Sequence, residues 1–175
     1  MSSHSHGPRR PLPQGEIGEL AVSGHITPGY YRAPELDAEA FDKDGYFLTG
    51  DLGSIEMDGR IRFRGRLKEM IKTGGINVAP LEVEQVLLQH PDIVQAFVVG
   101  VPDPSKGEIV AAAVELHAGA TADAAAIIAF CRDRLASYKV PERFAFRTAG
   151  VFPRTPTGKI HKPKLVDELA ATTVI

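Results

Sequence analysis

The stretch GRLKEMIKTGG, residues Gly65 to Gly75, decides how the rest of the sequence is interpreted. It carries three cations, Arg66, Lys68 and Lys72, and ends in a glycine pair. A solvated turn between two strands would explain the charges, because spaced lysines and arginines commonly mark an exposed face. Adjacent glycines are a costly way to continue an ordered segment, since glycine loses the most conformational entropy on folding. They are useful where a ligand must approach the main chain, so the stretch also fits a site for an anion.

The composition is that of a globular protein without an unusual charge balance. Of the 175 residues, 43% are hydrophobic and 24% are charged, and the formal net charge is −2. The absence of a basic excess argues against nucleic-acid binding. The longest apolar run, IVAAAVEL from Ile109, is too short to span a membrane, and no secretory signal follows Met1, so we expect a cytoplasmic protein. The single cysteine, Cys131, excludes an internal disulfide, and no residue cluster has metal-ligand spacing.

The first part of the sequence has short apolar runs separated by Gly and Asp, a pattern that is typical of a β-rich segment. Residues 1–13 are polar and rich in proline, and we interpret them as a disordered leader. In residues 14–65, GELAVSG predicts a strand, and GYFLTGD predicts a strand that ends in a tight turn. A hairpin is predicted around the Asp-Gly pair at 58–59. The alternation of Ile61 and Phe63 with arginines predicts that this hairpin has one wet face and one buried face.

Residues 66–175 have a mixed pattern that predicts a compact α+β domain with a small sheet flanked by helices. Pro80 can begin the helix PLEVEQVLLQH, whose glutamates and glutamine we expect to face water. DIVQAFVVGVP and GEIVAAAVELH are nearly continuous apolar runs and predict buried strands. Thr121 is predicted to cap a helix whose apolar face includes Cys131. RFAFRT predicts a further strand, and KPKLVDELA predicts a closing helix that begins at Pro163.

Two further positions outside the opening stretch could carry chemistry. Asp51 follows Thr-Gly at a strand end, where aspartate is ordinarily a turn residue, but a carboxylate there can also accept hydrogen bonds from sugar hydroxyls. Lys159 lies in the loop PRTPTGKI, which Pro153 and Pro156 stiffen. A Gly-Lys pair is usually a surface lysine. A flexible ammonium at the tip of a stiff loop can also neutralise a carboxylate or a phosphoryl oxygen. Cys131 is interpreted as a packing residue and not as a nucleophile.

Four stretches, taken in order, resemble the C-terminal part of the adenylate-forming enzymes, which include acyl-CoA synthetases, peptide-synthetase adenylation domains and luciferases. They are GELAVSGHITPGYYRAPELDAEAF, GYFLTGDLGSIEMDGRIRFRGRLKEMIKTGGINVAPLEVE, LASYKVPERF and PRTPTGKI. Together they cover nearly everything from Gly15 to Ile160. One such motif would be weak evidence, but four in the right order are specific. The resemblance implies that residues 14–65 end the large AMP-binding domain and that residues 66–175 form its mobile C-terminal domain.

The resemblance also implies a two-step ligase reaction. A carboxylic acid attacks the α-phosphate of ATP and gives an acyl-adenylate and pyrophosphate. The thiol of coenzyme A then displaces AMP and gives a thioester. The implied cofactors are ATP, coenzyme A and Mg²⁺, and no Mg²⁺ ligands are expected in this chain. The expected substrate is a fatty or aryl carboxylic acid, as in fatty acid metabolism.

The resemblance assigns roles to residues at matching positions. Asp51 is similar to the residue that holds the ribose hydroxyls, and Arg66 to its neighbour on the nucleotide. Lys68 occupies the hinge about which the C-terminal domain swings between the two half-reactions. Lys72 and the backbone of Gly74–Gly75 resemble elements that meet the adenylate and the pantetheine arm of coenzyme A after the swing.

Lys159 matches the catalytic lysine that bridges the acid and the α-phosphate during adenylation. The sequence after this lysine departs from the family pattern. Where the family often has an arginine two places after Ile160, this chain has Lys162, followed by Pro163. The departure leaves Lys159 in place.

The resemblance implies a missing partner, the N-terminal AMP-binding domain. That domain carries a Ser/Thr/Gly-rich phosphate loop ending in Pro-Lys-Gly and the acid pocket, and this sequence has no such loop. We therefore expect the chain alone to be inactive. One alternative is an adenylation-domain fragment that loads a carrier protein, although INVAPLEVE is more similar to the CoA ligases. Another is a non-catalytic relic or binding module, against which the joint presence of the matching aspartate, arginine and lysines argues.

Overall fold

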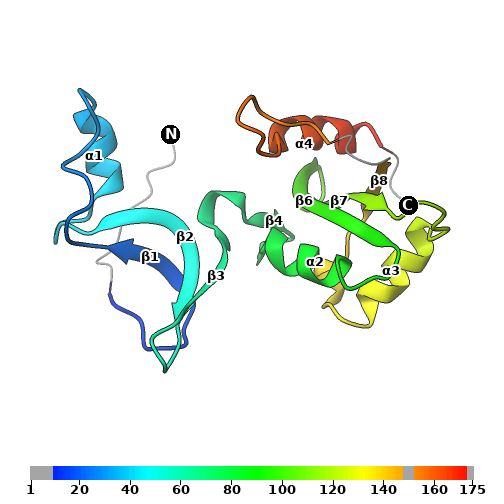
Figure 1. The fold of residues 1–175 in the computed structure, drawn as a ribbon, viewed down its shortest axis with the longest axis horizontal. Coiled ribbons are helices and arrows are strands. Elements are labelled where there is room, and N and C mark those ends of the chain that lie inside the picture. The colour runs from blue at the N-terminus through cyan, green and yellow to red at the C-terminus, as the bar shows by residue number, and fades with distance from the viewer. Residues whose placement is uncertain (1–9, 148–151, 173–175) are drawn as a thin grey trace. The chain divides into compact units, whose positions relative to one another are not determined.

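A computed structural model describes residues 10–147 and 152–172 of the chain (Figure 1). The chain separates into two compact units, Met1–Leu67 and Lys68–Ile175. Most of the predicted leader lies outside the described residues, and the assignment of residues 14–65 to a larger domain stays a prediction. In the described ranges, no helix has both the length and the apolar character that crossing a membrane requires.

The first unit is built on a three-stranded antiparallel sheet in the order β1-β2-β3. The strands are β1 (Gly18–Val22), β2 (Phe47–Ile55) and β3 (Ile61–Arg66), and helix α1 (Pro34–Ala40) connects the first two. The predicted hairpin between β2 and β3 is confirmed, because Gly59 has a φ of 81° in the turn and the amide of Glu56 bonds the carbonyl of Arg60.

The prediction that a strand ends at the Thr-Gly-Asp sequence is wrong. Strand β2 continues through Asp51, and Gly50 has a φ of 70° inside it. Between the β1 residues Glu19 and Ala21 the pairing register shifts, so that β2 carries a bulge around Gly50. The hydroxyl of Thr49 donates to the carbonyl of Leu20 across this bulge at 2.7 Å. A glycine in a strand marks a bulge as readily as a turn, and here it bends the strand without ending it.

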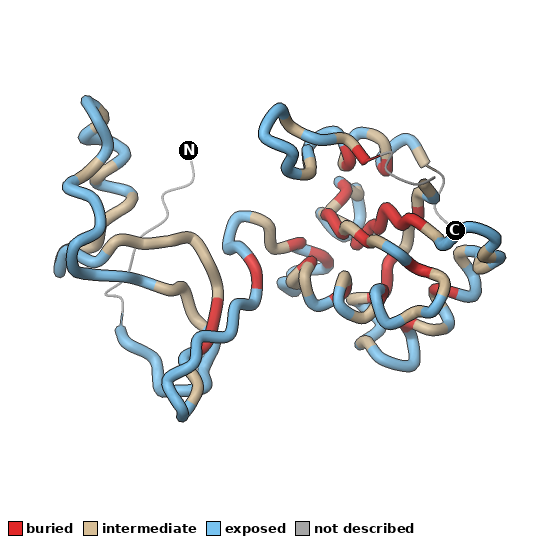
Figure 2. Tube along the Cα trace, viewed as in Figure 1, coloured by how far each residue is buried: buried red, intermediate tan, exposed pale blue. Residues whose placement is uncertain are grey.

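The prediction that one face of the β2–β3 hairpin is buried is also wrong for this unit. The side chains of Ile61 and Phe63 are 65% and 48% exposed. Among the described residues of this unit, the fully buried ones are Gly53, Ser54 and Gly65, and none is a large apolar residue (Figure 2). Strand alternation separates two faces, but burial needs a second layer of structure against one of them. Residues 10–67 do not supply that layer for β3.

The second unit contains a five-stranded sheet, and the predicted α+β fold is confirmed. Its strands follow the order β5-β4-β7-β6, and β8 pairs in parallel with β7. The strands are β4 (Ile71–Thr73), β5 (Ile76–Val78), β6 (Ile93–Asp103), β7 (Gly107–Leu116) and β8 (Arg143–Arg147). The helices are α2 (Pro80–Leu87), α3 (Ala124–Arg132) and α4 (Lys162–Ala170), with short 3₁₀ turns η1 (Leu67–Glu69) and η2 (Ser137–Lys139).

Strands β6 and β7 are buried on both faces, which explains their continuous apolar runs. On one face, Val98 and Val110 pack in a cluster with side chains of α2 and α3. On the other face, Val99 and Ile109 pack with Leu165 of α4. Helices α2 and α3 lie on one side of these strands and α4 lies on the other (Figure 1). Each fully buried aliphatic side chain contributes about 1.5–3 kcal/mol, so this sandwich holds the unit together.

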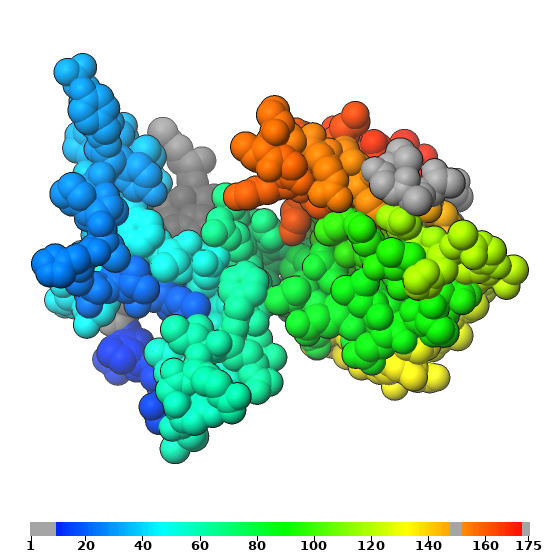
Figure 3. Space-filling model, in the orientation of Figure 1, coloured from blue at the N-terminus to red at the C-terminus, as the bar shows by residue number. Residues whose placement is uncertain are grey.

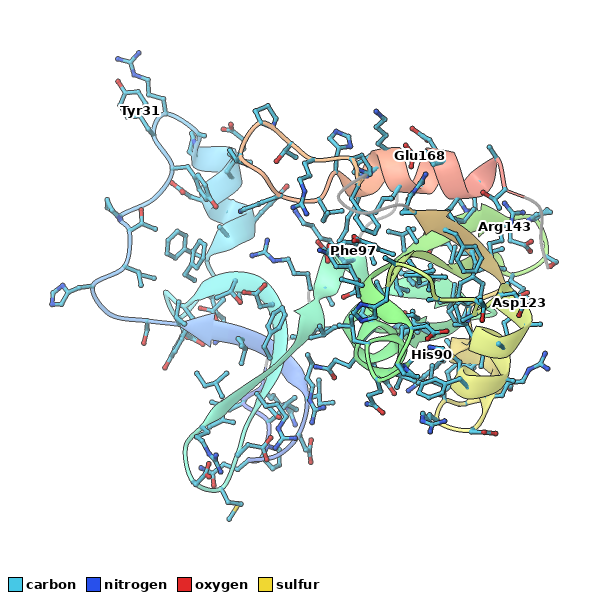
Figure 4. The ribbon with its side chains drawn as sticks, turned by 45° about the vertical axis from the view of Figure 1, so that its right-hand side comes forward. Tyr31, His90, Phe97, Asp123, Arg143 and Glu168 are labelled. Atoms are coloured by element: carbon cyan, nitrogen blue, oxygen red, sulfur yellow. The ribbon has the colours of Figure 1, made fainter. Side chains whose placement is uncertain are left out.

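The predicted helix starts are partly confirmed. Pro80 begins α2, and Pro163 lies in the first turn of α4. The predicted cap at Thr121 is wrong, because Asp123 caps α3 and its Oδ1 accepts from the amide of Ala126 at 2.9 Å (Figure 4). A cap must lie directly before the first helical residue, and Thr121 lies two residues too early. The packing role of Cys131 is confirmed, because the thiol is buried and burial raises its pKa to about 11.

Replacing the cap of α3 should weaken the second unit. We expect Asp123→Ala to lower the free energy of unfolding by about 1 kcal/mol, because one amide of the first helical turn loses its acceptor. Thr121→Ala is the matched control and should change it by less than about 0.5 kcal/mol. Urea denaturation followed by circular dichroism measures both. Equal losses in the two variants would contradict the assignment of the cap.

Candidate functional site

Asp51 and Arg66, the two predicted nucleotide-binding residues, lie side by side in the first unit. They are paired across β2 and β3, and the Arg66 Nε lies 2.8 Å from the Asp51 Oδ1. Both side chains remain partly open to solvent. The bulge positions Asp51, because its amide donates to the hydroxyl of Thr49. The arrangement presents a carboxylate with a fixed cationic neighbour, which suits a ligand that carries both hydroxyl and phosphate groups.

Lys68, the predicted hinge residue, is the first residue of the second unit. It lies in the 3₁₀ turn η1, which contains no buried residue and leads from β3 to β4. Its side chain is exposed. A change of backbone angles at this turn would not open the core described above, since none of the three side chains belongs to it. The pivot role itself stays a prediction.

The glycine pair of the opening stretch forms the turn between β4 and β5. Gly74 and Gly75 have φ values of 55° and 80°, and Thr73 pairs with Ile76 across them. Two positive φ values in a two-residue loop define a hairpin turn that strongly prefers glycine. The turn alone therefore explains the pair. Nothing within 4 Å would meet a Cβ at either position, so a ligand has room to approach this turn, although the Gly74 amide already donates to the carbonyl of Lys106 at 2.8 Å. Lys72 lies on β4 with its side chain exposed.

A carboxylate that the sequence analysis missed holds the strand of Lys72. The Glu108 Oε2 accepts from the Lys72 amide at 2.7 Å. A Cβ at Gly100 would lie 2.9 Å from the Glu108 Cδ, so the glycine leaves the space that this carboxylate occupies. Glycine in a strand often marks such a close approach, but the sequence could not name the group that approaches.

Gly100→Ala should free the strand of Lys72 without unfolding the protein. The added methyl group must displace the Glu108 carboxylate, and the Lys72 amide then loses its acceptor. We expect amide exchange at Lys72 to rise at least about tenfold, the equivalent of one lost hydrogen bond. Global stability should change by less than about 1 kcal/mol, because replacing a strand glycine offsets part of the loss.

Exchange at single amides, followed by NMR, measures this effect. Glu108→Ala should reproduce it, and adding Gly100→Ala to that variant should have little further effect, because both changes remove the same contact. Additive increases in the exchange rate would show that Gly100 acts by another route.

Lys159 directly follows the turn of a hydrogen-bonded hairpin and does not lie on an irregular loop. Arg154 pairs with Ile160, and the Thr155 amide bonds the carbonyl of Lys159 at 2.7 Å. Gly158 has a φ of 82° in the turn. Ile160 packs against the α4 side of the sheet, whereas the Lys159 side chain is exposed. This hairpin and α4 form the orange-to-red surface of the second unit (Figure 3). The backbone before the ammonium is therefore held firmly while the ammonium itself is free to meet an anion.

An open cavity of about 630 Å³ lies beside Lys159 in the second unit. Phe97 lines it and makes an edge-to-face contact with Phe152, with ring centroids 4.8 Å apart (Figure 4). The other lining residues are Glu69, Glu84, Thr155, Ile160, His161, Lys162 and Pro163. The cavity combines apolar side chains with four charged ones, those of Glu69, Glu84, Lys159 and Lys162.

Three charged side chains of this cavity were missed or misplaced by the sequence analysis. The Lys162 Nζ lies 2.5 Å from the Glu69 Oε2, and both side chains are about one-third exposed. Glu84, which was expected to face water, is half-buried, and its Oε1 accepts from the Val98 amide at 2.9 Å. Burial raises the pKa of the Glu84 carboxyl, and the nearby Lys162 opposes that rise. The one sequence signal was that Lys162 stands where the resemblance puts an arginine.

The described ranges, residues 10–147 and 152–172, contain no group of three or more His, Cys, Asp or Glu side chains that could hold a metal ion. Two carboxylates line the cavity, those of Glu69 and Glu84; the Lys162 ammonium pairs with the first and opposes the rise in the pKa of the second. With Glu69 already paired to an ammonium, these residues do not fit a Mg²⁺ site.

The chain is similar to known proteins along most of its length. Residues 82–159 match the family described as AMP-binding enzyme C-terminal domain. The chain is 42% identical over 159 residues to a sulfoacetate–CoA ligase of Cupriavidus necator, covering 90% of this chain and 31% of that protein. It is 43% identical over 157 residues to a 2-succinylbenzoate–CoA ligase of Geobacillus kaustophilus, covering 89% and 31%. The chain therefore spans about a third of the length of these curated relatives.

Solved structures give the same result. ATP-bound MatB from Rhodopseudomonas palustris matches with a TM-score of 0.84 and 37% identity, over 91% of this chain and 32% of that one. Apo MatB from the same organism matches over the same shares with a TM-score of 0.67. The chain is therefore similar to the C-terminal part of the adenylate-forming enzymes.

Proposed function

We propose that this chain is the C-terminal portion of an ATP-dependent carboxylic acid–CoA ligase, which makes an acyl-adenylate and then an acyl-CoA thioester. The observation that carries the proposal is Lys159, an exposed ammonium on a hydrogen-bonded hairpin whose next residue is anchored in the core. The Asp51–Arg66 pair supports it, since it supplies the carboxylate and cation that a nucleotide needs. Relatives at 42–43% identity are CoA ligases.

Lys159 would serve the first half-reaction. A carboxylate oxygen of the acid bonds to the α-phosphorus of ATP while the bond from that phosphorus to the pyrophosphate oxygen breaks. Two anions meet in this step, and their repulsion must be offset by fixed positive charge. An ammonium that reaches both the acid and the α-phosphate offsets it at the point where the new bond forms. Asp51 and Arg66 would meanwhile hold the ribose and the adjacent phosphate.

A different face of the same unit would serve the second half-reaction. The sulfur of coenzyme A attacks the acyl carbon, and the bond to AMP breaks. The β4–β5 hairpin offers Lys72 and the open backbone of Gly74–Gly75 to the adenylate and to the thin pantetheine arm. A swing about Lys68 would exchange this hairpin for the Lys159 loop, which is a gating motion of a known kind.

No residue of this chain is proposed to select the carboxylic acid. The relatives at 42% and 43% identity act, by their names, on sulfoacetate and on 2-succinylbenzoate, which differ greatly in size and charge. A C-terminal part that is this similar to both does not distinguish them. We propose that the N-terminal AMP-binding domain selects the acid and that the substrate is a fatty or aryl acid. ATP and coenzyme A are the co-substrates.

A chimera tests the proposal directly. Residues 14–175 would replace the matching third of the Cupriavidus necator sulfoacetate–CoA ligase. We expect the chimera to form sulfoacetyl-CoA with release of AMP and pyrophosphate, and we expect the 175-residue chain alone not to exchange pyrophosphate into ATP. A folded chimera that makes no adenylate would contradict the proposal. Transfer to a carrier protein but not to coenzyme A would favour the carrier-loading alternative.

In this chimera, Lys159→Ala should separate the two half-reactions. We expect adenylate formation to fall at least about a hundredfold, because a fixed positive charge at the forming bond is lost. Thioester formation from preformed acyl-adenylate should stay within about twofold of the unaltered chimera. Lys164→Ala removes another exposed lysine close to the hairpin and is the control. Pyrophosphate exchange and single-turnover thioester assays measure the two steps, and equal loss in both would refute the role of Lys159.

A further inference from the structure

We propose that Lys162 is a positioning residue, whose ammonium bridges to Glu69 and fixes the Lys159 hairpin to the residue directly after the predicted pivot. This inference rests on the proposed function, because it concerns how Lys159 reaches its place. Lys162 is not proposed to touch a substrate. It acts through the rigidity that it gives to the hairpin.

The bridge joins two places that are far apart in the sequence. Glu69 is the last residue of η1 and directly follows Lys68. Lys162 is the first residue of α4 and lies three positions after Lys159. The Nζ of Lys162 lies 2.5 Å from the Glu69 Oε2 across 93 residues of sequence. One contact thus connects the residue after the predicted pivot with the end of the hairpin that carries the predicted catalytic lysine.

The bridge crosses a region where apolar packing is sparse. The 630 Å³ cavity beside Lys159 and a second cavity of about 230 Å³ are both lined by Glu69, Lys162 and Pro163. The second cavity also reaches Lys68. The Glu69–Lys162 ion pair therefore borders open space in two cavities. An ion pair beside open space contributes more to holding η1 and α4 together than an ion pair that a packed core supports.

The electrostatic setting favours a fixed position for the Lys162 ammonium. Both members of the pair are about two-thirds covered, which shields the pair from solvent more than an ordinary surface pair. Glu84 adds a second carboxylate from α2, held by its hydrogen bond to the Val98 amide. The Lys162 and Glu69 charges both act on Glu84, with opposite signs. Without Lys162, the partly buried Glu69 carboxylate would lose the ammonium that pairs with it.

The hairpin itself transmits this position to Lys159. The His161 amide bonds the carbonyl of Pro153 at 2.8 Å, and the Arg154 guanidinium bonds the carbonyl of Gly158 at 2.9 Å. His161 is also the cap of α4, since its Nδ1 accepts from the Lys164 amide. The segment from Pro153 to the start of α4 is closed on itself. Holding Lys162 therefore holds the base of the turn from which Lys159 projects.

Amide exchange in the 175-residue chain tests the bridge without any catalysis. We expect Lys162→Met, which keeps the length of the side chain and removes its charge, to raise exchange at Gly158 and His161 at least about tenfold. Lys162→Arg should restore slow exchange, because a guanidinium can bond the same carboxylate. Glu69→Gln is a milder second variant, which should raise exchange at the same amides if Lys162→Met does not fold.

A second ion pair in the same unit supplies the matched control. The Lys139 Nζ lies 2.6 Å from the Glu82 Oε1 and joins η2 to α2. This pair does not involve the hairpin or η1. Lys139→Met should therefore leave exchange at Gly158 and His161 within about twofold. An equal rise in this variant, or no rise in the Lys162 and Glu69 variants, would overturn the proposed bridge.

The chimera tests the consequence for the reaction. Lys162→Met should lower the rate of adenylate formation about tenfold and leave thioester formation from preformed acyl-adenylate unchanged, and Lys162→Arg should restore the first rate. Equal loss in both steps would indicate a general structural role and overturn the positioning role, as would an unchanged first rate. An inactive chimera with Lys162 intact would instead contradict the proposed function, while the exchange experiment would still decide whether the bridge holds the hairpin.

Discussion

The burial of strands β6 and β7 on both faces is the constraint on which the second unit depends. The two strands pair from Ile93 opposite Leu116 to Asp103 opposite Gly107. Their side chains alternate between the α2 and α3 side and the α4 side, so each strand contributes to two cores. On β7, Ala111 and Ala113 face α4 and leave room for its leucines. Because α4 is fixed by this packing, the hairpin before it is joined to the sheet at one end.

The sequence predicted the elements of the second unit well because their signals are periodic or positional. Continuous apolar runs indicated strands buried on both faces, and Pro80 marked a helix start. The failures came where a local signal has several structural meanings. Gly50 produces a bulge and not a turn, since positive φ is compatible with both. The alternation at Ile61 and Phe63 separated two faces correctly in principle, but no local pattern states whether another layer covers one of them.

The candidate site was only half visible in the sequence for a related reason. Ordered motifs with matching gaps pointed to Asp51, Arg66 and Lys159, and the structure places the first two in direct contact. Contacts between distant residues leave no trace in spacing. The hydrogen bond from the Lys72 amide to the Glu108 carboxylate joins residues 36 positions apart, and the Glu69–Lys162 ion pair joins residues 93 positions apart. The charges in a single sequence would have suited many other partners equally well, and only the fold selects these.

A unit that serves two chemical steps must be rigid within itself and free at its connection. The distribution of burial in this chain meets both requirements. The side chains of η1 include no buried residue, so a change of angle at Lys68 breaks no apolar packing. One residue later, Glu69 already belongs to the rigid part, because it pairs with the start of α4. Lys68 is therefore free to change its backbone angles, whereas the next residue, Glu69, is held in the second unit. If the proposed swing occurs, a pivot this narrow would make the angle at Lys68 determine the position of Lys159.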